Sequence, residues 1–236
     1  YFSYWRGGIS IKEVFSDIIV EAPLGSRTKL TLPDGTLVWL NAGSRITYSQ
    51  GFGVGNRKIE LIGEGYFEVK RNEEVPFLVK TNSLLVKVLG TKFNFRDYPD
   101  DAEAIVSLSE GKVALNNLLK KEKEAFLLPN ERVVLNKKNG RMHVEYSTVS
   151  NALQWTNGYL FFDEELLPDV VKELERSYNV KIQIASDTLN TFRFYGNFVH
   201  REQNIQEVLE ALSATRKIHY IIEGHNITAH PINLGD

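Results

Sequence analysis

The chain between residues 21 and 146 consists of many short runs of alternating apolar and polar residues, separated by turn residues. The clearest pair, 29–32 and 37–40, flanks the turn sequence Pro33-Asp34-Gly35-Thr36. Because an Asp-Gly pair between two alternating runs favours a tight turn between antiparallel strands, we predict a β-hairpin here. No segment of this region has a 3.6-residue period. The pattern predicts an all-β domain built as a sandwich, a barrel or a solenoid-like stack of short strands.

The pattern changes after Trp155, where two segments acquire the periodicity of amphipathic helices. One spans 166–178, and the other spans 205 to about 215. Asn204 and Glu207 are placed to form a capping box at the start of the second helix. Strand-like runs surround both helices, so the predicted order is β-α-β-β-α-β-β. We expect a mainly β chain that ends in α+β, with both helices on one face of a single small sheet.

These patterns divide the chain into an N-terminal segment at 1–20, an all-β domain at 21–150 and a small α+β domain at 151–236. The first segment opens with an aromatic cluster, Tyr1 to Trp5, a composition enriched where a chain leaves a membrane. We interpret it as a membrane-exit segment; the alternative is an aromatic strand that packs on the core. The sequence contains no apolar run of the roughly 18 residues that a membrane-spanning helix needs, and no signal-peptide pattern.

Composition excludes several classes of protein. The 236 residues include no cysteine, which excludes a disulfide scaffold. Lys and Arg number 28 against 30 Asp and Glu, so the chain lacks the excess of basic residues that nucleic-acid-binding proteins usually carry. Hydrophobic residues make up 42% and charged residues 25%, which is typical of a globular protein and not of a disordered or fibrous one.

Motifs for metal binding, phosphate binding and covalent catalysis are missing from the sequence. The five histidines form no HExxH motif, and a zinc site without cysteine would need histidines and carboxylates alone. His219, His225 and His230 gather near the C-terminus, where a surface of strands and turns explains them. The glycine-rich segment 51–55 precedes a strand and not a helix, so we interpret it as a loop. The sequence predicts no catalytic residue, no metal and no cofactor.

One pair of carboxylates suggests an alternative function. Glu64 and Glu68 would share one face of a strand, and a glycosidase needs two carboxylates at a fixed separation. Trp39 or Tyr66 would then offer a flat surface to a sugar ring. Because a β-rich chain contains many such pairs by chance, we predict a non-enzymatic protein and keep a carbohydrate-binding or carbohydrate-active β domain as the alternative.

The remaining function is the binding of a partner protein. Exposed edges of a small sheet carry unpaired backbone groups, which a partner strand can complete. The candidate edge is the apolar run Tyr159, Leu160, Phe161 and Phe162. A continuous apolar run is also typical of a central strand buried on both faces, and this alternative stays open.

Several motifs follow one another in order along the chain. In the β-rich part they are Ala22–Arg27, Leu32–Thr36, Val38–Ser44, Arg57, Leu61–Val69, Pro76–Phe77 and Leu89–Asn94. These motifs resemble the FecR-type domain of anti-sigma factors, and Gly65, where that family often has alanine, is the one departure. The later motifs are Trp155, Gly158, Phe161–Asp163 and Leu174–Val180. They resemble the small C-terminal domain that follows FecR in Bacteroides-type bacteria, which is similar to the N-terminal signalling domain (STN) of secretins and TonB-dependent receptors.

The resemblance implies the periplasmic region of a transmembrane sensor. In that family, the periplasmic region receives a signal from the N-terminal signalling domain of a TonB-dependent outer-membrane transducer. A cytoplasmic segment, absent from this chain, binds an extracytoplasmic-function sigma factor, and a single N-terminal helix, also absent here, anchors the protein in the inner membrane. The resemblance implies no catalytic residue, no cofactor and no nucleic-acid partner.

Overall fold

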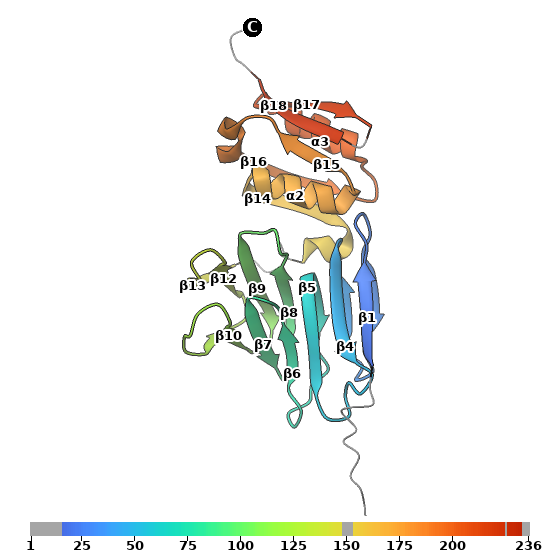
Figure 1. The fold of residues 1–236 in the computed structure, drawn as a ribbon, viewed down its shortest axis with the longest axis vertical. Coiled ribbons are helices and arrows are strands. Elements are labelled where there is room, and N and C mark those ends of the chain that lie inside the picture. The colour runs from blue at the N-terminus through green and yellow to red at the C-terminus, as the bar shows by residue number, and fades with distance from the viewer. Residues whose placement is uncertain (1–15, 148–152, 225, 233–236) are drawn as a thin grey trace, which may run out of the picture.

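The computed structural model describes residues 16–147, 153–224 and 226–232 and shows two domains stacked along the longest axis (Figure 1). The aromatic cluster Tyr1 to Trp5 and the expected domain boundary at 150 lie outside the described residues. The first strand begins at Asp17, so the end of the segment that we assigned to membrane exit belongs to the β domain. Within the described residues, no helix is both long and apolar enough to span a membrane.

The first domain contains strands and no helix among its described residues. Most of the strands are only four to six residues long, as the spacing of turn residues predicts. Its strands are β1 (Asp17–Ala22), β2 (Thr28–Thr31), β3 (Leu37–Leu40), β4 (Ser44–Ser49), β5 (Arg57–Glu68), β6 (Phe77–Lys80), β7 (Leu84–Val88), β8 (Lys92–Asp97), β9 (Glu103–Glu110), β10 (Val113–Asn117), β11 (Ala125–Leu127), β12 (Glu131–Asn136) and β13 (Met142–Tyr146).

The long strand β5 belongs to two sheets. Its first half pairs with β4 and β6, in a sheet ordered β1-β4-β5-β6-β7-β10-β11. Its second half pairs with β3 and β8, in a sheet ordered β2-β3-β5-β8-β9-β12-β13. Gly63 stands at the change of partners with a φ of 95°, and a Cβ there would lie 2.4 Å from Ser44 Oγ. Only glycine therefore fits this position.

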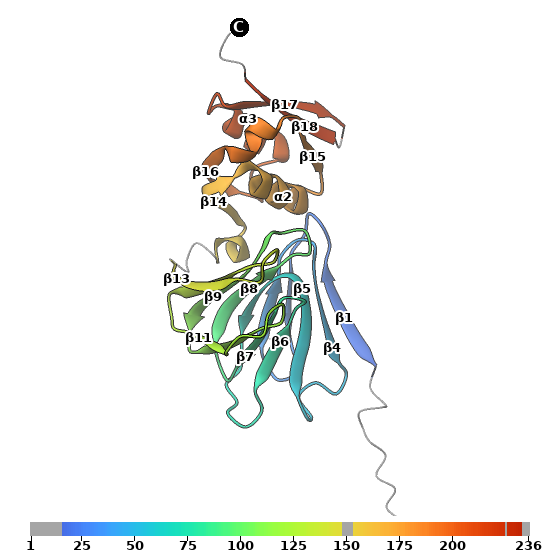
Figure 2. The ribbon, with the colours of Figure 1, turned by 60° about the vertical axis from the view of Figure 1, so that its left-hand side comes forward.

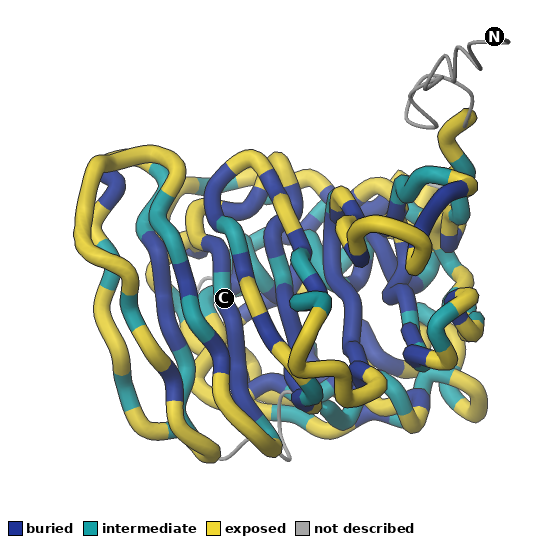
Figure 3. Tube along the Cα trace, turned by 90° about the horizontal axis from the view of Figure 1, so that it is seen from below, coloured by how far each residue is buried: buried dark blue, intermediate teal, exposed yellow. Residues whose placement is uncertain are grey.

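The two sheets enclose one hydrophobic core, so the all-β domain is a sandwich. Figure 3 shows buried positions along the strands of both layers of the sandwich. Phe67 of the second sheet lies 6.3 Å from Phe77 of the first and stacks on Phe93 at 5.0 Å, measured between ring centroids. All three rings are fully buried. Side chains from both sheets join them in one continuous cluster.

The predicted hairpin is confirmed as β2 and β3. Gly35 takes a φ of 85° in the turn, and the Asp34 carboxylate accepts hydrogen bonds from the backbone and hydroxyl of Thr36 at 2.9 Å. Buried Arg57 donates to Asp34 at 3.1 Å and to the carbonyls of Lys70 and Val75 at 2.8 Å. The arginine thereby ties the hairpin to the connection between β5 and β6.

The second domain has the predicted order β-α-β-β-α-β-β, together with two short 3₁₀ segments. Its strands form two sheets, β14 with β16 and β15-β18-β17, so the expectation of one sheet was wrong. Helix α2 contacts both sheets, because its apolar residues are spread widely enough to pack on each side. The elements are η2 (Gln154–Asn157), β14 (Tyr159–Leu166), α2 (Leu167–Tyr178), β15 (Lys181–Ile184), η3 (Asp187–Thr191), β16 (Arg193–Val199), α3 (Ile205–Ser213), β17 (Ile218–Glu223) and β18 (Asn226–Pro231).

Both helices begin close to the predicted positions. Pro168 lies in the first turn of α2, where no backbone donor is needed, and the helix ends before Asn179 in the left-handed conformation. Asn204 and Glu207 form the predicted capping box of α3. Figure 2 shows η2 between the sandwich and β14, at the junction of the two domains.

Candidate functional site

A buried hydrogen-bond network closes the end of the sandwich that faces the second domain. Glu64, on β5 directly after Gly63, is 5% exposed. Its carboxylate accepts hydrogen bonds from the amide groups of Asn41 at 2.9 Å and Asn94 at 2.8 Å. The indole N–H of Trp155 in η2 donates to Asn94 Oδ1 at 3.1 Å. Side chains of β5, of β8 and of the residue after β3 are thus connected, through Asn94, to the second domain.

Tyr98 and Ser44 extend this network. The Tyr98 hydroxyl donates to the Ala42 carbonyl at 2.8 Å and lies 3.2 Å from Ser44 Oγ, which accepts from the Glu64 backbone N–H at 2.9 Å. Burial raises the pKa of the Tyr98 hydroxyl, so it stays protonated as a donor. The network holds the loop after β3 against β5 and against the turn after β8.

A cluster of four charged side chains crosses the junction. Arg96 of β8 contacts Asp101 at 2.8 Å and Glu173 of α2 at 3.3 Å. Arg176 of α2 contacts Asp101 at 3.0 Å and Glu173 at 3.4 Å, and its guanidinium lies 4.0 Å from the centre of the Tyr98 ring. Each domain supplies one arginine and one carboxylate, so each half of the cluster is neutral, and contact between the domains adds the two cross-domain pairs Arg96–Glu173 and Arg176–Asp101.

Burial and charge act in opposite directions on these carboxylates. Burial alone would raise the pKa of Glu173 and of Asp101, but the attraction of Arg96 and Arg176 outweighs it and lowers both pKa values. Glu64 lies farther from the arginines, and burial raises its pKa despite its two amide donors. The ionic cluster therefore depends on two ionised carboxylates.

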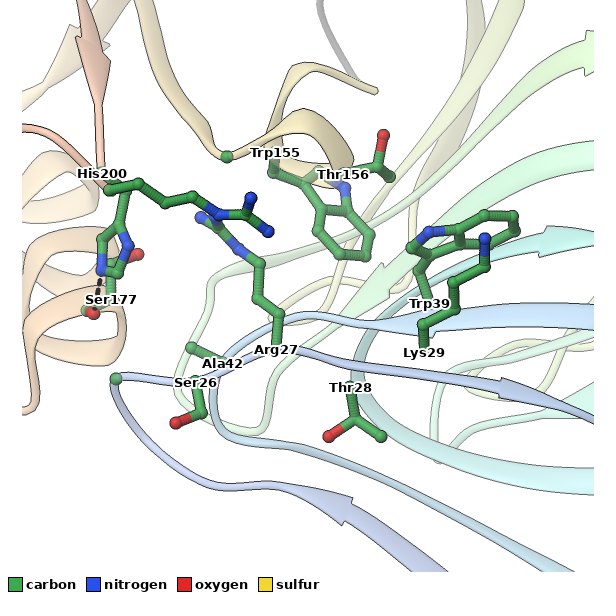
Figure 4. Close-up of a pocket in the computed structure, with 13 residues that line it drawn as sticks. Ser26, Arg27, Thr28, Lys29, Trp39, Ala42, Trp155, Thr156, Ser177 and His200 are labelled. Carbon is green, nitrogen blue, oxygen red and sulfur yellow. Dashed lines mark hydrogen bonds between the residues drawn. The ribbon is translucent and has the colours of Figure 1, made fainter.

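Two cavities flank the junction. The smaller, of about 380 Å³, lies among the turn after β1, η2, the end of α2 and the turn after β16 (Figure 4). Arg27 and Trp155 point into it, and Lys29 lies 4.4 Å above the Trp39 ring. His200 Nε2 is 2.6 Å from the Ser177 carbonyl, so this nitrogen carries the proton.

The larger cavity is a groove of about 920 Å³ between the domains. Residues 159–166 of β14 form one wall, and residues of β9, β12 and β13 form the other. Its lining contains both signs of charge, with Arg132 and Arg193 among several acidic residues, whereas no acidic residue lines the smaller cavity.

The groove exposes an unpaired backbone edge. Among the described residues, β14 pairs with β16 alone. The His200 N–H donates to the Gly158 carbonyl, so residues 158 and 200 form a hydrogen-bonded pair. From this pair onward, hydrogen-bonded pairs alternate with pairs that are not hydrogen-bonded. By that alternation, Leu160 and Phe162 bond to β16, while the N–H and C=O of Tyr159 and Phe161 face outward. Leu160 and Phe162 are also the residues of this run whose side chains are buried in the core; they are 2% and 4% exposed.

A β-bulge limits this edge to its first half. The register shifts between Phe162 and Glu165, and Glu164 takes a φ of 56°. The Glu164 side chain hydrogen-bonds the Tyr195 hydroxyl, and its carbonyl accepts from Arg193 at 2.5 Å. Because a bulge bends a strand and interrupts further pairing, the straight edge available to a partner is 159–162.

Comparisons with known proteins match both domains. Residues 19–114 match the model for the FecR protein family, and residues 159–229 match the model for the FecR C-terminal domain. Two crystal structures, at 1.65 and 2.50 Å, of a protein assigned as an anti-sigma factor from Parabacteroides distasonis ATCC 8503 are each 32% identical to this chain, with a TM-score of 0.84. Each alignment covers 92% of this chain and 100% of that one. This chain belongs to the FecR family of anti-sigma factors. No curated protein sequence matches the chain.

FecR membership places the chain in a regulatory class, and the two carboxylates of the carbohydrate alternative have different hydrogen-bond partners. Glu64 is enclosed by two asparagine amides, while Glu68 accepts a hydrogen bond from the Tyr66 hydroxyl at 3.3 Å. Lys29 lies over the Trp39 ring, and the buried Tyr66 ring lies 5.3 Å from the same ring.

The histidines and the glycine-rich loop of the FecR chain have ordinary surroundings. The rings of His219 and His230 stack at 5.3 Å across β17 and β18, and His225 lies outside the described residues. Within the described part of the chain, no group of three or more His, Asp or Glu side chains is placed to hold a metal ion. Residues 51–55 form turns between β4 and β5, as the sequence predicts.

Sequence reasoning missed the charged cluster that joins the two FecR domains. Arg176 lies within the motif 174–180, but an arginine on a helix is ordinarily a solvent-exposed residue. One signal was available: Glu173 and Arg176 stand three residues apart, on the same face as the buried Ser177. Nothing in the sequence connects them with Arg96 and Asp101 of the other domain.

Proposed function

We propose that this chain is the periplasmic sensor region of a FecR-type anti-sigma factor. In this proposal it receives a signal from the N-terminal signalling domain of a TonB-dependent outer-membrane transducer and regulates an extracytoplasmic-function sigma factor, without catalysis. A cytoplasmic segment binds the sigma factor, and one inner-membrane helix connects that segment to the part described. Family membership and the match to an anti-sigma factor over 92% of the chain support this assignment.

The observation that carries partner binding is the free edge of β14. The outward backbone groups of Tyr159 and Phe161 offer two donors and two acceptors, and a strand of the transducer domain would satisfy them by β-augmentation. The groove leaves about 920 Å³ beside this edge. A strand there would also meet residues of β9, β12 and β13, so one partner would contact both domains.

Contact with both domains gives binding a route to signalling. A partner shifts a protein between two states only when it binds one state more tightly than the other. The groove changes shape if α2 moves relative to the sandwich, because β14 leads directly into α2. A partner that fits one arrangement of the domains would therefore favour that arrangement.

The test is titration calorimetry of this chain against the isolated signalling domain of the transducer encoded beside it. We expect saturable 1:1 binding. Phe161→Pro removes one outward N–H without removing a bond to β16, and should weaken binding by about tenfold or more, which corresponds to roughly 1.4 kcal/mol.

Ile222→Pro is the matched control. In the ladder between β17 and β18, the Ile232 N–H donates to the Lys217 carbonyl, which makes 217 and 232 a hydrogen-bonded pair. By the same alternation, Ile222 and Ile227 are not hydrogen-bonded to each other, so the Ile222 N–H faces outward at the edge of the three-stranded sheet. This variant should bind as tightly as the parent chain. Equal losses from both prolines, or none from Phe161→Pro, would remove β14 as the binding edge. Absence of binding by every neighbouring transducer would contradict the proposed function.

A further inference from the structure

The smaller cavity at the junction has an unbalanced charge. Arg27, Lys29 and Arg201 line it together with His200, and none of its lining residues is acidic. The groove on the same junction contains nine acidic lining residues and three arginines. The smaller cavity is therefore a local concentration of positive charge in a chain whose net charge is −2.

These cations form no direct ion pair with a carboxylate within the described part of the chain. None of its ion pairs includes Arg27, Lys29 or Arg201. Arg27 donates from Nε to Asn41 Oδ1 at 2.9 Å, but its buried Nη2 has no hydrogen-bond partner. A buried donor without an acceptor is costly, so an anionic oxygen that reached this nitrogen would satisfy it.

The walls of the cavity suit an organic anion. Trp155 and Trp39 contribute aromatic surface, and a volume of about 380 Å³ exceeds the roughly 30 Å³ share of one water molecule by more than tenfold. Arg27, Lys29 and Trp39 come from the sandwich, while His200 and Arg201 come from the second domain. A bound anion would therefore bridge the two domains.

We propose that this cavity binds a carboxylate group, which Arg27 and Arg201 hold from opposite domains while Trp155 packs against the rest of the ligand. Two sources can supply this chemistry: a free organic acid, or the acidic side chain of a protein partner. The site lies on residues separate from the β14 edge, so it does not depend on transducer binding at that edge. Because such binding is charge-driven and partly exposed, it should weaken as ionic strength rises.

The test uses two matched pairs of probes in titration calorimetry with the whole chain at low salt. D-glucuronate and D-glucose differ in a carboxylate, and the capped peptides acetyl-Glu-Glu-Glu-amide and acetyl-Gln-Gln-Gln-amide differ in charge alone. We expect at least one anionic probe to bind saturably at about 1 mM or below, with its neutral counterpart at least tenfold weaker. Binding of glucuronate alone identifies a free acid as the source, and binding of the peptide alone identifies a partner side chain.

Two variants locate the site. Arg201→Gln alters an exposed side chain that forms no ion pair among the described residues, and it should weaken anion binding about tenfold or more while leaving the unfolding midpoint unchanged. Arg141→Gln, at an exposed position on the sandwich, should bind like the parent chain. Failure of both anions to bind, equal binding of the neutral probes, or full binding by Arg201→Gln would overturn the proposal.

Discussion

The two domains close their cores in different ways. In the sandwich, β5 pairs with four strands and carries the hydrogen-bond ladder from one sheet into the other. In the second domain, two small sheets are separate and are held together by the side chains of α2. The sandwich is thus a continuous scaffold, whereas the second domain depends on α2 to join its two sheets.

The apolar cores of the two domains are separate clusters, and partly or fully buried charged side chains meet at the junction between them. Removing one member of a buried ion cluster leaves the others without compensation, so such a cluster is sensitive to small changes. The comparison predicts that substitutions at the junction affect both domains, whereas substitutions inside one domain affect the stability of that domain first.

The largest effect is expected from Arg176→Ala. This change leaves Asp101 and Glu173 with Arg96 as their remaining partner and should lower the free energy of unfolding at pH 7 by about 3–5 kcal/mol. Urea denaturation followed by tryptophan fluorescence measures it. The control is Lys172→Ala, which removes a partly exposed donor to the Asp100 carbonyl and should cost less than about 1 kcal/mol.

The same variant has a pH signature. Asp101 and Glu173 have lowered pKa values in the folded chain, so their contribution is present above the unfolded pKa of about 4 and is lost as the pH falls through the folded values. The difference between the parent chain and Arg176→Ala should therefore shrink from pH 7 to pH 3. An unchanged difference would show that the loss comes from packing.

Gly63→Ala tests the continuity of the sandwich. The new Cβ would collide with Ser44 in a backbone conformation that alanine disfavours, so we expect a loss of about 3 kcal/mol in unfolding free energy. Gly53→Ala is the matched control, because its φ of 89° is similar but no atom lies within 4 Å of the added Cβ. Similar losses in both variants would assign the effect to backbone conformation alone.

Trp155→Phe tests the neutral contact across the junction. The indole N–H that reaches Asn94 is lost while most of the aromatic volume remains. The buried side-chain oxygen of Asn94, Oδ1, then loses this donor, so we expect the free energy of unfolding to fall by about 1–3 kcal/mol. Thermal unfolding followed by circular dichroism measures the change. A change within experimental error would mean that the hydrogen bond does not contribute to holding the domains together.

The smallest effect is expected from Asn204→Ala, within the second domain. It removes the side-chain cap of α3, which is typically worth about 1 kcal/mol. Hydrogen exchange should show faster opening of α3 and unchanged protection of β5. Faster exchange in β5 as well would contradict the separation of the two domains.

Local signals in the sequence predicted most elements. The Asp34-Gly35 turn, the capping box of α3 and the order of strands and helices in the second domain are encoded by neighbours in the chain. The motif 159–162 indicated a strand. Whether that strand is a free edge or a buried central strand depends on which strands lie beside it, and local sequence does not show this.

Pairing between strands that are distant in the sequence could not be predicted from local signals in the same way. Nothing near Gly63 shows that β5 changes partners there, because the partners come from 37–40, 44–49, 77–80 and 92–97. The cavity of Arg27 and Arg201 combines residues from distant parts of the chain. Separation along the sequence also explains why the expected single sheet in the second domain was wrong, since α2 could pack on one sheet or between two.

The pairing of β1 with β4 has a mechanical consequence. β1 runs from Asp17, at the end of the sandwich farthest from the second domain, to Ala22 near the junction (Figure 1). Its six residues pair antiparallel with 44–49 along their whole length. A pull on Asp17 directed away from the second domain would load this ladder lengthwise, with all its hydrogen bonds sharing the force at once. The geometry therefore makes the attachment of β1 to the sandwich resistant to a force applied along the strand.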